Sequence, residues 1–254
     1  MPLPDALKRV AVLGFERAEL SIHYKPAWGH IIPDTVQNEP ENALAMVREA
    51  IDESGVRISA IATHFDPLSQ SERGQFEAVC NLAGELGIPL VSVIANQPSE
   101  WIAANSMKDH VAMAGNRGIS LAVEIHRPSV VTDPQSALRL IDQVRGLKLT
   151  LDTGHLLSNG YPKEEWLPLF PHVKHVHVKD SGGTVDLVQI RVGEGLLDVG
   201  FLLANLSAAG YQGELVVEYM GPRDGREAAM DYEKETVRMR EVLESALLDS
   251  GTGS

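Results

Sequence analysis

The chain has little of several features that mark particular classes of protein. It holds a single cysteine, Cys80, in 254 residues, which excludes an intrachain disulfide framework and a zinc site built on cysteines. No apolar run reaches the roughly 18–20 residues that a membrane span needs. The first residues lack the basic-then-apolar pattern of a signal peptide. We therefore expect a cytoplasmic protein without a membrane partner.

Basic residues are also scarce. Lysine and arginine total 22 against 35 aspartates and glutamates, which gives a formal net charge of −13. Such a surface repels phosphate backbones, so we expect no nucleic-acid partner. The 44% of apolar and 22% of charged residues are ordinary for a globular protein. Because no linker or low-complexity tract divides the sequence, we expect one domain over 1–254, with 250–254 as a frayed tail.

Short runs rich in Val, Ile and Leu alternate with stretches of helical periodicity, and this alternation predicts parallel βα units. The expected strands are 17–23, 57–64, 90–95, 120–126, 148–152, 173–179 and 214–220. The expected helices are 5–14, 41–54, 71–87, 99–116, 134–145, 163–169, 198–209 and 226–247. A chain of about 250 residues with this pattern suits a (β/α)8-type TIM barrel.

Seven strands are one short of that barrel. The sequence opens with a helical pattern where a first strand would normally come, so we expect a barrel that lacks its first strand or has an altered one. Unpaired strand edges are costly, so another segment or a partner subunit could cover the gap. The alternative, an open doubly wound sheet, lacks a Gly-x-Gly-x-x-Gly turn after any strand.

Acidic residues and a histidine end four successive predicted strands: Glu124, Asp152, His177 and Glu218. Side chains alternate along a strand, so Glu124 shares a face with Ala122, while its apolar neighbours face the helices. Active sites of such barrels form where the C-terminal ends of the strands meet. One glutamate at a strand end is more simply a solvated or ion-paired side chain, but four such residues on four strands indicate a common site.

Two glutamates, one aspartate and one histidine suit a divalent metal ion. Carboxylate oxygens and one imidazole are typical ligands of Mn²⁺, Mg²⁺ or Co²⁺, with Zn²⁺ as a further candidate. Without a cation, three carboxylates would repel each other in a site of low dielectric constant.

Five motifs carry a resemblance to a known family. They are Ala-Val-Glu-Ile-His (122–126), Leu-Asp-Thr-Gly-His (151–155), His-Val-His-Val-Lys-Asp (175–180), Gly-Glu-Gly (193–195) followed by Asp198, and Val-Val-Glu-Tyr (216–219). From about residue 5 to 245 the sequence resembles the sugar isomerase/epimerase superfamily, the xylose isomerase-like barrels. These include ketose 3-epimerases, inosose dehydratases and relatives of endonuclease IV. The sequence departs from the sugar enzymes at Ile125, where they often have Asn, and at Val192, where they often have Pro.

The resemblance implies a ligand set and a reaction. Glu124, Asp152, His177 and Glu218 would bind one divalent ion, and Glu124 and Glu218 would also be the acid/base pair. His155 would hydrogen-bond a substrate oxygen, and Arg191 would bind a hydroxyl or phosphate. The implied activity is isomerisation or epimerisation of a sugar, keto-sugar or cyclitol through a metal-stabilised enediolate. A homodimer or tetramer is also implied, and the exposed edge of the barrel favours association.

Other polar residues have two interpretations each. His64 either contacts substrate or caps the barrel, and Trp28 either stacks on a sugar face or packs in its loop. Lys179 either orients the substrate or pairs with a neighbouring aspartate, Asp180 or Asp152.

Three further histidines and acids are expected to support the site rather than form it. His126 shares the face of Glu124 and is expected in a supporting layer. His175 is expected to be a hydrogen-bonded core histidine, and Glu19 a buried acid near the barrel floor.

Three alternative functions stay open. A lyase acting on an inosose or a 3-keto-glycoside would begin with the same proton abstraction. An endonuclease IV-like activity is disfavoured by the charge of −13 and by the absence of histidine between Asp186 and Arg191. A non-catalytic binding protein is disfavoured because all four candidate ligands are present.

Overall fold

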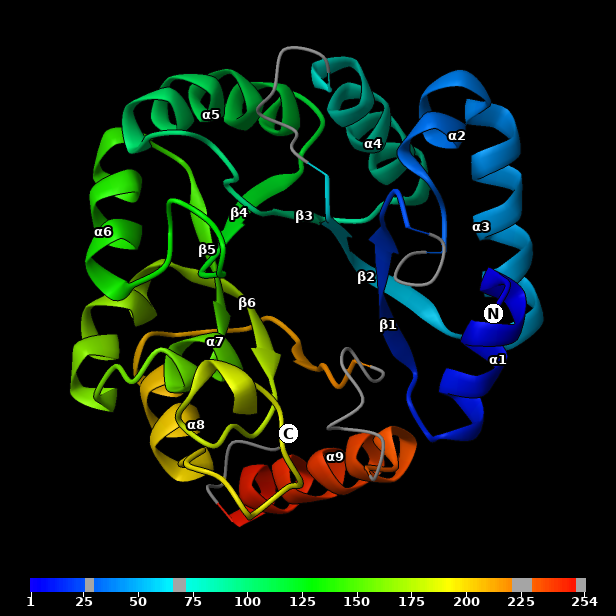
Figure 1. Cartoon of the computed structure of the whole chain (residues 1–254). Coiled ribbons are helices and arrows are strands. Elements are labelled where there is room, and N and C mark those ends of the chain that lie inside the picture. Colours follow the sequence, from blue (N-terminus) through cyan, green and yellow to red (C-terminus); the bar gives the residue numbers. More distant parts are fainter. Residues whose placement is uncertain (26–29, 66–71, 221–229, 250–254) are drawn as a thin grey trace.

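The computed structural model describes residues 1–25, 30–65, 72–220 and 230–249. Seven parallel strands follow one another around a ring in the order of the sequence, with helices outside them (Figure 1). The strands are β1 (Arg17–Ile22), β2 (Arg57–Thr63), β3 (Leu90–Val93), β4 (Ser120–Glu124), β5 (Lys148–Asp152), β6 (Val173–Val178) and β7 (Leu215–Val217). The fold is therefore a nearly closed, seven-stranded form of the TIM barrel.

The helices lie between these strands. They are α1 (Leu3–Val12), α2 (Pro33–Asn38), α3 (Pro40–Ser54), α4 (Arg73–Leu86), α5 (Glu100–Gly115), α6 (Pro134–Gln143), α7 (Thr153–Ser158), α8 (Val199–Ala208) and α9 (Tyr232–Asp249), with 3-10 helices η1 (Lys163–His172) and η2 (Val185–Leu187). The α-helix expected over 163–169 is instead part of the 3-10 helix η1. Pro168 and Pro171 lie inside η1 and cannot donate backbone hydrogen bonds, which disfavours an α-helix there. Helices α2 and α7 were not predicted.

Successive side chains of a strand point to opposite faces, so the buried apolar residues form two clusters, one outside and one inside the ring of strands. Val123 and Ile125 belong to the large core between strands and helices, as their positions in the sequence predicted. Ala60, Leu90 and Ala122 form a separate small cluster. Their side chains share the alternate face of their strands and fill the inside of the ring. This small apolar floor leaves the opposite end of the ring to polar side chains.

The position of the absent strand lies between β7 and β1, the two edge strands of the sheet. All three residues of β7 are partly exposed, whereas β3 is wholly buried. Arg17, at the start of β1, forms an ion pair with Glu214, just before β7. Behind the strands, Arg240 of α9 donates a hydrogen bond of 2.8 Å to the Leu13 carbonyl after α1. The Arg17–Glu214 ion pair thus connects the two edges of the sheet, and the Arg240–Leu13 bond connects the helices behind them.

No helix in the described part of the chain combines the length and the apolar character that crossing a membrane requires. Trp28 and the expected tail 250–254 lie outside the described residues.

Candidate metal centre

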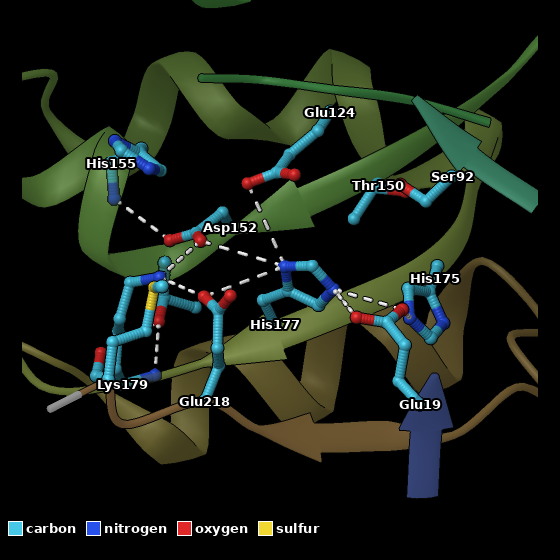
Figure 2. A network of polar contacts seen from close by, with 12 residues as sticks. Glu19, Ser92, Glu124, Thr150, Asp152, His155, His175, His177, Lys179 and Glu218 are labelled. Carbon is cyan, nitrogen blue, oxygen red and sulfur yellow. Dashed lines mark hydrogen bonds and ion pairs between the residues drawn. The ribbon is translucent and has the colours of Figure 1, made fainter. Parts of the chain in front are cut away.

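Four side chains predicted to bind metal meet at the C-terminal end of the ring (Figure 2). Glu124 is the last residue of β4, Asp152 is the last of β5, His177 lies near the end of β6, and Glu218 directly follows β7. The Nδ1 atom of His177 lies 3.7 Å from Glu124 Oε1, 3.8 Å from Asp152 Oδ2 and 3.7 Å from Glu218 Oε2. One imidazole nitrogen therefore faces three carboxylates from three other strands or strand ends.

These atoms fit a divalent cation. His177 Nδ1 is buried, and no group in the described residues hydrogen-bonds to it. The three carboxylate oxygens are too far from it for hydrogen bonds. Nitrogen and oxygen atoms bound to one metal ion at about 2.1 Å lie roughly 3–4 Å apart, as His177 Nδ1 does from each of the three carboxylates. Ligand atoms of Glu124, Asp152 and His177, one from each residue, also lie within 4.8 Å of one another. An ion among them would satisfy the unpaired nitrogen and offset the repulsion between the carboxylates.

The backbone places Asp152 and His177 side by side. They are partners in the β5–β6 register, and the Glu218 amide donates to the Val178 carbonyl at 3.1 Å, which continues the pairing beyond β7. Asp152 also caps helix α7, because its Oδ1 accepts a hydrogen bond of 2.9 Å from the His155 amide. That bond fixes the carboxylate with Oδ2 turned toward His177.

Glu19 of β1 holds the other side of the His177 ring. Its Oε1 lies 3.1 Å from His177 Nε2, and its Oε2 lies 2.5 Å from His175 Nε2. A carboxylate on one ring nitrogen turns the other nitrogen toward the metal, an arrangement common around metal-bound histidines. Glu19 was expected as a structural acid near the floor; the structure instead connects it to a candidate ligand. His175 is the buried, hydrogen-bonded histidine expected.

The charges of these groups shift one another's pKa values. Burial opposes ionisation of Glu19, but the charges of His177 and His175 outweigh it and hold the pKa of Glu19 well below its usual range. Burial also opposes charge on His177, yet Glu19 and Glu218 raise the pKa of His177 well above its usual value. For Glu124, contact with His177 outweighs burial and lowers the pKa to about 2. Glu124 is therefore ionised at neutral pH.

Lys179, which directly follows β6, reaches two of the same carboxylates. Its ammonium lies 2.5 Å from Asp152 Oδ2 and forms a second ion pair with Glu218 Oε2. From the sequence, either Asp152 or Asp180 was a possible partner of Lys179. In the structure Lys179 pairs with Asp152 and also with Glu218. Burial opposes its charge, but these two carboxylates keep the pKa of Lys179 above its usual value. The side chain thus shares two acceptor oxygens with the candidate metal site.

Gly154 makes room for this lysine. A Cβ atom at position 154 would lie 2.5 Å from Lys179 Cε and 2.7 Å from the Val188 carbonyl oxygen. The glycine of the Leu-Asp-Thr-Gly-His motif is therefore required by close packing against the lysine.

Comparison with known proteins places this arrangement in a family. Residues 7–242 match the family described as xylose isomerase-like TIM barrel. The chain belongs to this family. An uncharacterized protein of Methanocaldococcus jannaschii is 25% identical over 232 residues, which cover 81% of this chain and 78% of that protein.

Solved structures share the fold, including a xylose isomerase-like TIM barrel protein and a ketose epimerase. One from Mycobacterium smegmatis, in complex with magnesium, has a TM-score of 0.77 at 16% identity, covering 98% of this chain and 90% of that one. A D-psicose 3-epimerase with D-tagatose from Clostridium cellulolyticum H10 has a TM-score of 0.74 at 12% identity, covering 96% and 93%. Identities this low show the fold alone.

The residues predicted to bind substrate do not all gather at the candidate metal centre. His155 lies beside the cluster; burial lowers the pKa of its ring to about 4, so the ring is neutral at pH 7. His64 follows β2, where its ring stacks on His23 with centroids 5.4 Å apart. The side chain of Arg191 is half exposed, with Nη1 3.9 Å from Glu194 Oε1. The expectation for Trp28 falls outside the described residues.

Asp180 explains the Gly-Glu-Gly motif. Its buried carboxylate accepts backbone hydrogen bonds from Gly193, Gly195 and Leu197 at 2.9, 3.1 and 3.0 Å. A Cβ atom at position 195 would lie 2.1 Å from Asp180 Oδ1, so only glycine fits there. The sequence did not reveal this role, although an aspartate followed by a glycine turn was a usable signal.

Proposed function

We propose that the protein is a divalent-metal-dependent isomerase or epimerase acting on a sugar, keto-sugar or cyclitol. The observation that carries the proposal is the buried, unpaired Nδ1 of His177, with carboxylates from β4, β5 and the end of β7 at 3.7–3.8 Å. Mn²⁺, Mg²⁺ or Co²⁺ suits these oxygen-rich ligands, and Zn²⁺ is a further candidate. The sugar ligand of the D-psicose 3-epimerase neighbour supports the substrate class.

A divalent ion bound there would stabilise negative charge on a substrate carbonyl oxygen when the neighbouring C–H loses its proton. The chain itself would move that proton. Glu124 and Glu218 lie on different sides of His177 Nδ1 in Figure 2, and Glu124 is ionised at neutral pH. One carboxylate can remove the proton, and the other can return one to the opposite face, which inverts the carbon centre.

Further residues would bind the substrate. The neutral ring of His155 offers one N–H donor and one acceptor to substrate oxygens. Lys179, held beside Glu218, would direct a proton or hydroxyl toward that carboxylate. His64, Arg191 and Trp28 stay predictions for the outer part of the site. A homo-oligomer stays the prediction for assembly, because the edge strand β7 is partly exposed.

Hydrogen–deuterium exchange tests this function. The Mn²⁺-loaded protein would be incubated in D₂O with ketohexoses, inososes and 3-keto-glycosides, and the products followed by NMR. We expect deuterium at the carbon next to the carbonyl together with the epimer or isomer. Deuterium with loss of water or of an aglycone would instead establish the lyase alternative.

Two variants and a control connect the exchange to the site. Glu124→Gln and Glu218→Gln should each abolish formation of the epimer, because an amide can neither take nor return the proton on its face. For a given substrate, the variant at the carboxylate that faces the C–H should also abolish exchange. Glu85→Gln removes an exposed carboxylate at the surface pair with Arg48 and should leave exchange unchanged. Exchange that survives in both site variants would contradict the proposed acid/base pair, and a metal-loaded protein without exchange on any of these substrates would contradict the function.

A further inference from the structure

Glu218 is the most exposed of the four candidate ligands. Its side chain is 20% exposed, whereas those of Glu124 and Asp152 are 4% and 0% exposed. It directly follows β7, an edge strand of the sheet that pairs only with β6. That pairing reaches the Glu218 amide, which donates to the Val178 carbonyl at 3.1 Å. The backbone beyond Glu218 therefore needs a support other than a neighbouring strand.

The side chain of Gln189 provides this support at Met220, two residues after Glu218. Gln189 Oε1 accepts a hydrogen bond of 3.0 Å from the Met220 amide, and Nε2 donates one of 2.6 Å to the Met220 carbonyl. A glutamine carboxamide carries the same kinds of donor and acceptor as a peptide unit, so it can take the place of a neighbouring strand. Gln189 is buried, and a buried backbone amide without a partner would be costly.

The loop that carries Gln189 is itself fixed. The amide of Ile190, the next residue, donates to the Asp180 carbonyl at 3.0 Å. The Asp180 amide donates in turn to the hydroxyl of Tyr219 at 3.2 Å. Because Tyr219 directly follows Glu218, the loop contacts both residues that come after this ligand.

We propose that Gln189 is a positioning residue for Glu218. By holding Met220, it fixes the direction of the backbone after β7 and keeps the Glu218 carboxylate beside Lys179 and His177 (Figure 2). This inference rests on the proposed function, in which Glu218 binds the ion and moves a proton. A carboxylate that is already in place loses less freedom when an ion binds, and a small displacement of a proton-transferring group slows the reaction strongly.

Amide hydrogen exchange in the metal-free protein tests the contact itself. Gln189→Met keeps the length of the side chain but removes both hydrogen bonds. We expect the Met220 amide to exchange at least about fivefold faster in this variant, the factor for one lost hydrogen bond, with no change in the central strands β4 and β5. Gln143→Met is the matched control and should change neither, because the exposed Gln143 also donates to a backbone carbonyl. Unchanged exchange at Met220, or equally faster exchange in all strands, would overturn the proposal.

Mn²⁺ affinity, measured by titration calorimetry, tests the effect on Glu218. We expect Gln189→Met to weaken Mn²⁺ binding about tenfold, because residues that orient metal ligands typically contribute that much, and Gln143→Met to leave it unchanged. Faster exchange at Met220 together with Mn²⁺ affinity equal to that of the wild type would show that Gln189 holds the backbone without positioning the ligand, which overturns the proposal.

Metal-free crystal structures separate this proposal from the proposed function. A wild type that binds no Mn²⁺ contradicts the proposed function, but the ion pair between Lys179 and Glu218 still reports where the carboxylate lies. The proposal predicts that this pair is kept in the wild type and lost in Gln189→Met, and a variant that keeps it overturns the proposal. Thermal melting checks folding. If Gln189→Met does not fold, Gln189→Glu takes its place, since it keeps the acceptor for the Met220 amide and loses only the donor.

Discussion

Replacing Lys179 by methionine removes the cation that now faces Asp152 and Glu218 while keeping most of the side-chain volume. Without metal, the buried Asp152 and the partly exposed Glu218 then lose their partner. Breaking a buried ion pair by removing one member typically costs about 3–5 kcal/mol of unfolding free energy. At about 2–4 °C per kcal/mol for a chain of this size, the melting temperature of the metal-free variant should fall by roughly 6–20 °C.

Metal binding should respond in the opposite direction. Lys179 Nζ lies 2.5 Å from Asp152 Oδ2, and an ion bound to that oxygen at about 2.1 Å would lie within about 4.6 Å of the ammonium. With an effective dielectric constant of about 20, the repulsion between charges of +1 and +2 at that distance is about 7 kcal/mol. A tenfold change in affinity corresponds to about 1.4 kcal/mol, which is a small part of that repulsion.

We therefore expect Lys179→Met to bind Mn²⁺ at least about tenfold more tightly than the wild type, although its metal-free form is less stable. Titration calorimetry and melting with and without Mn²⁺ measure both effects. Lys174→Met is the matched control and should change neither, because Lys174 lies on β6, which Lys179 directly follows, and its side chain is exposed. Weaker or unchanged Mn²⁺ binding in Lys179→Met would refute the electrostatic reasoning and indicate that the lysine positions the ligands.

Glu19→Gln should weaken metal binding by about 10–100-fold because the amide holds His177 less firmly. Glu16→Gln, three residues earlier and exposed, should not weaken it, and equal affinities of the two variants in titration calorimetry would contradict this expectation. Burial raises the pKa of the Cys80 thiol to about 12, so a thiol reagent at pH 8 should react only with unfolded protein. Because the unfolded thiol loses its proton above about pH 8.5 while the folded one keeps it, stability should fall as the pH rises from about 8.5 toward 12; rapid labelling in the native state would disprove the burial. Asp198→Ala removes the 2.9 Å cap of α8 and should cost about 1 kcal/mol, seen as a lower melting temperature.

The sequence alone was sufficient for the strands and for the four residues that meet at their ends. Central strands buried on both faces read as apolar runs, and a polar residue ending such a run is conspicuous. Because parallel strands of a barrel present their C-terminal ends at one rim, Glu124 and Asp152 could be placed together before any coordinates were known.

Contacts across the ring could not be predicted in this way. Glu19 contacts His175 and His177 although β1 and β6 are not neighbouring strands. Neither the alternation of side chains along one strand nor the register between paired strands could therefore predict this contact. The partners of Lys179 depend on which way a long side chain turns, and Gly154 permits that direction. Helix α7 has only six residues, which is too short for a periodic pattern of apolar residues. Its N-cap is Asp152, which the sequence analysis had interpreted as a metal ligand and not as the start of a helix.

Anomalous diffraction from crystals of the Mn²⁺-loaded protein would test the central claim most directly. The account predicts a manganese peak among His177 Nδ1, Glu124, Asp152 and Glu218, at about 2.0–2.3 Å from their ligand atoms. A fully loaded crystal with no peak there, and with Lys179 still between Asp152 and Glu218, would contradict it.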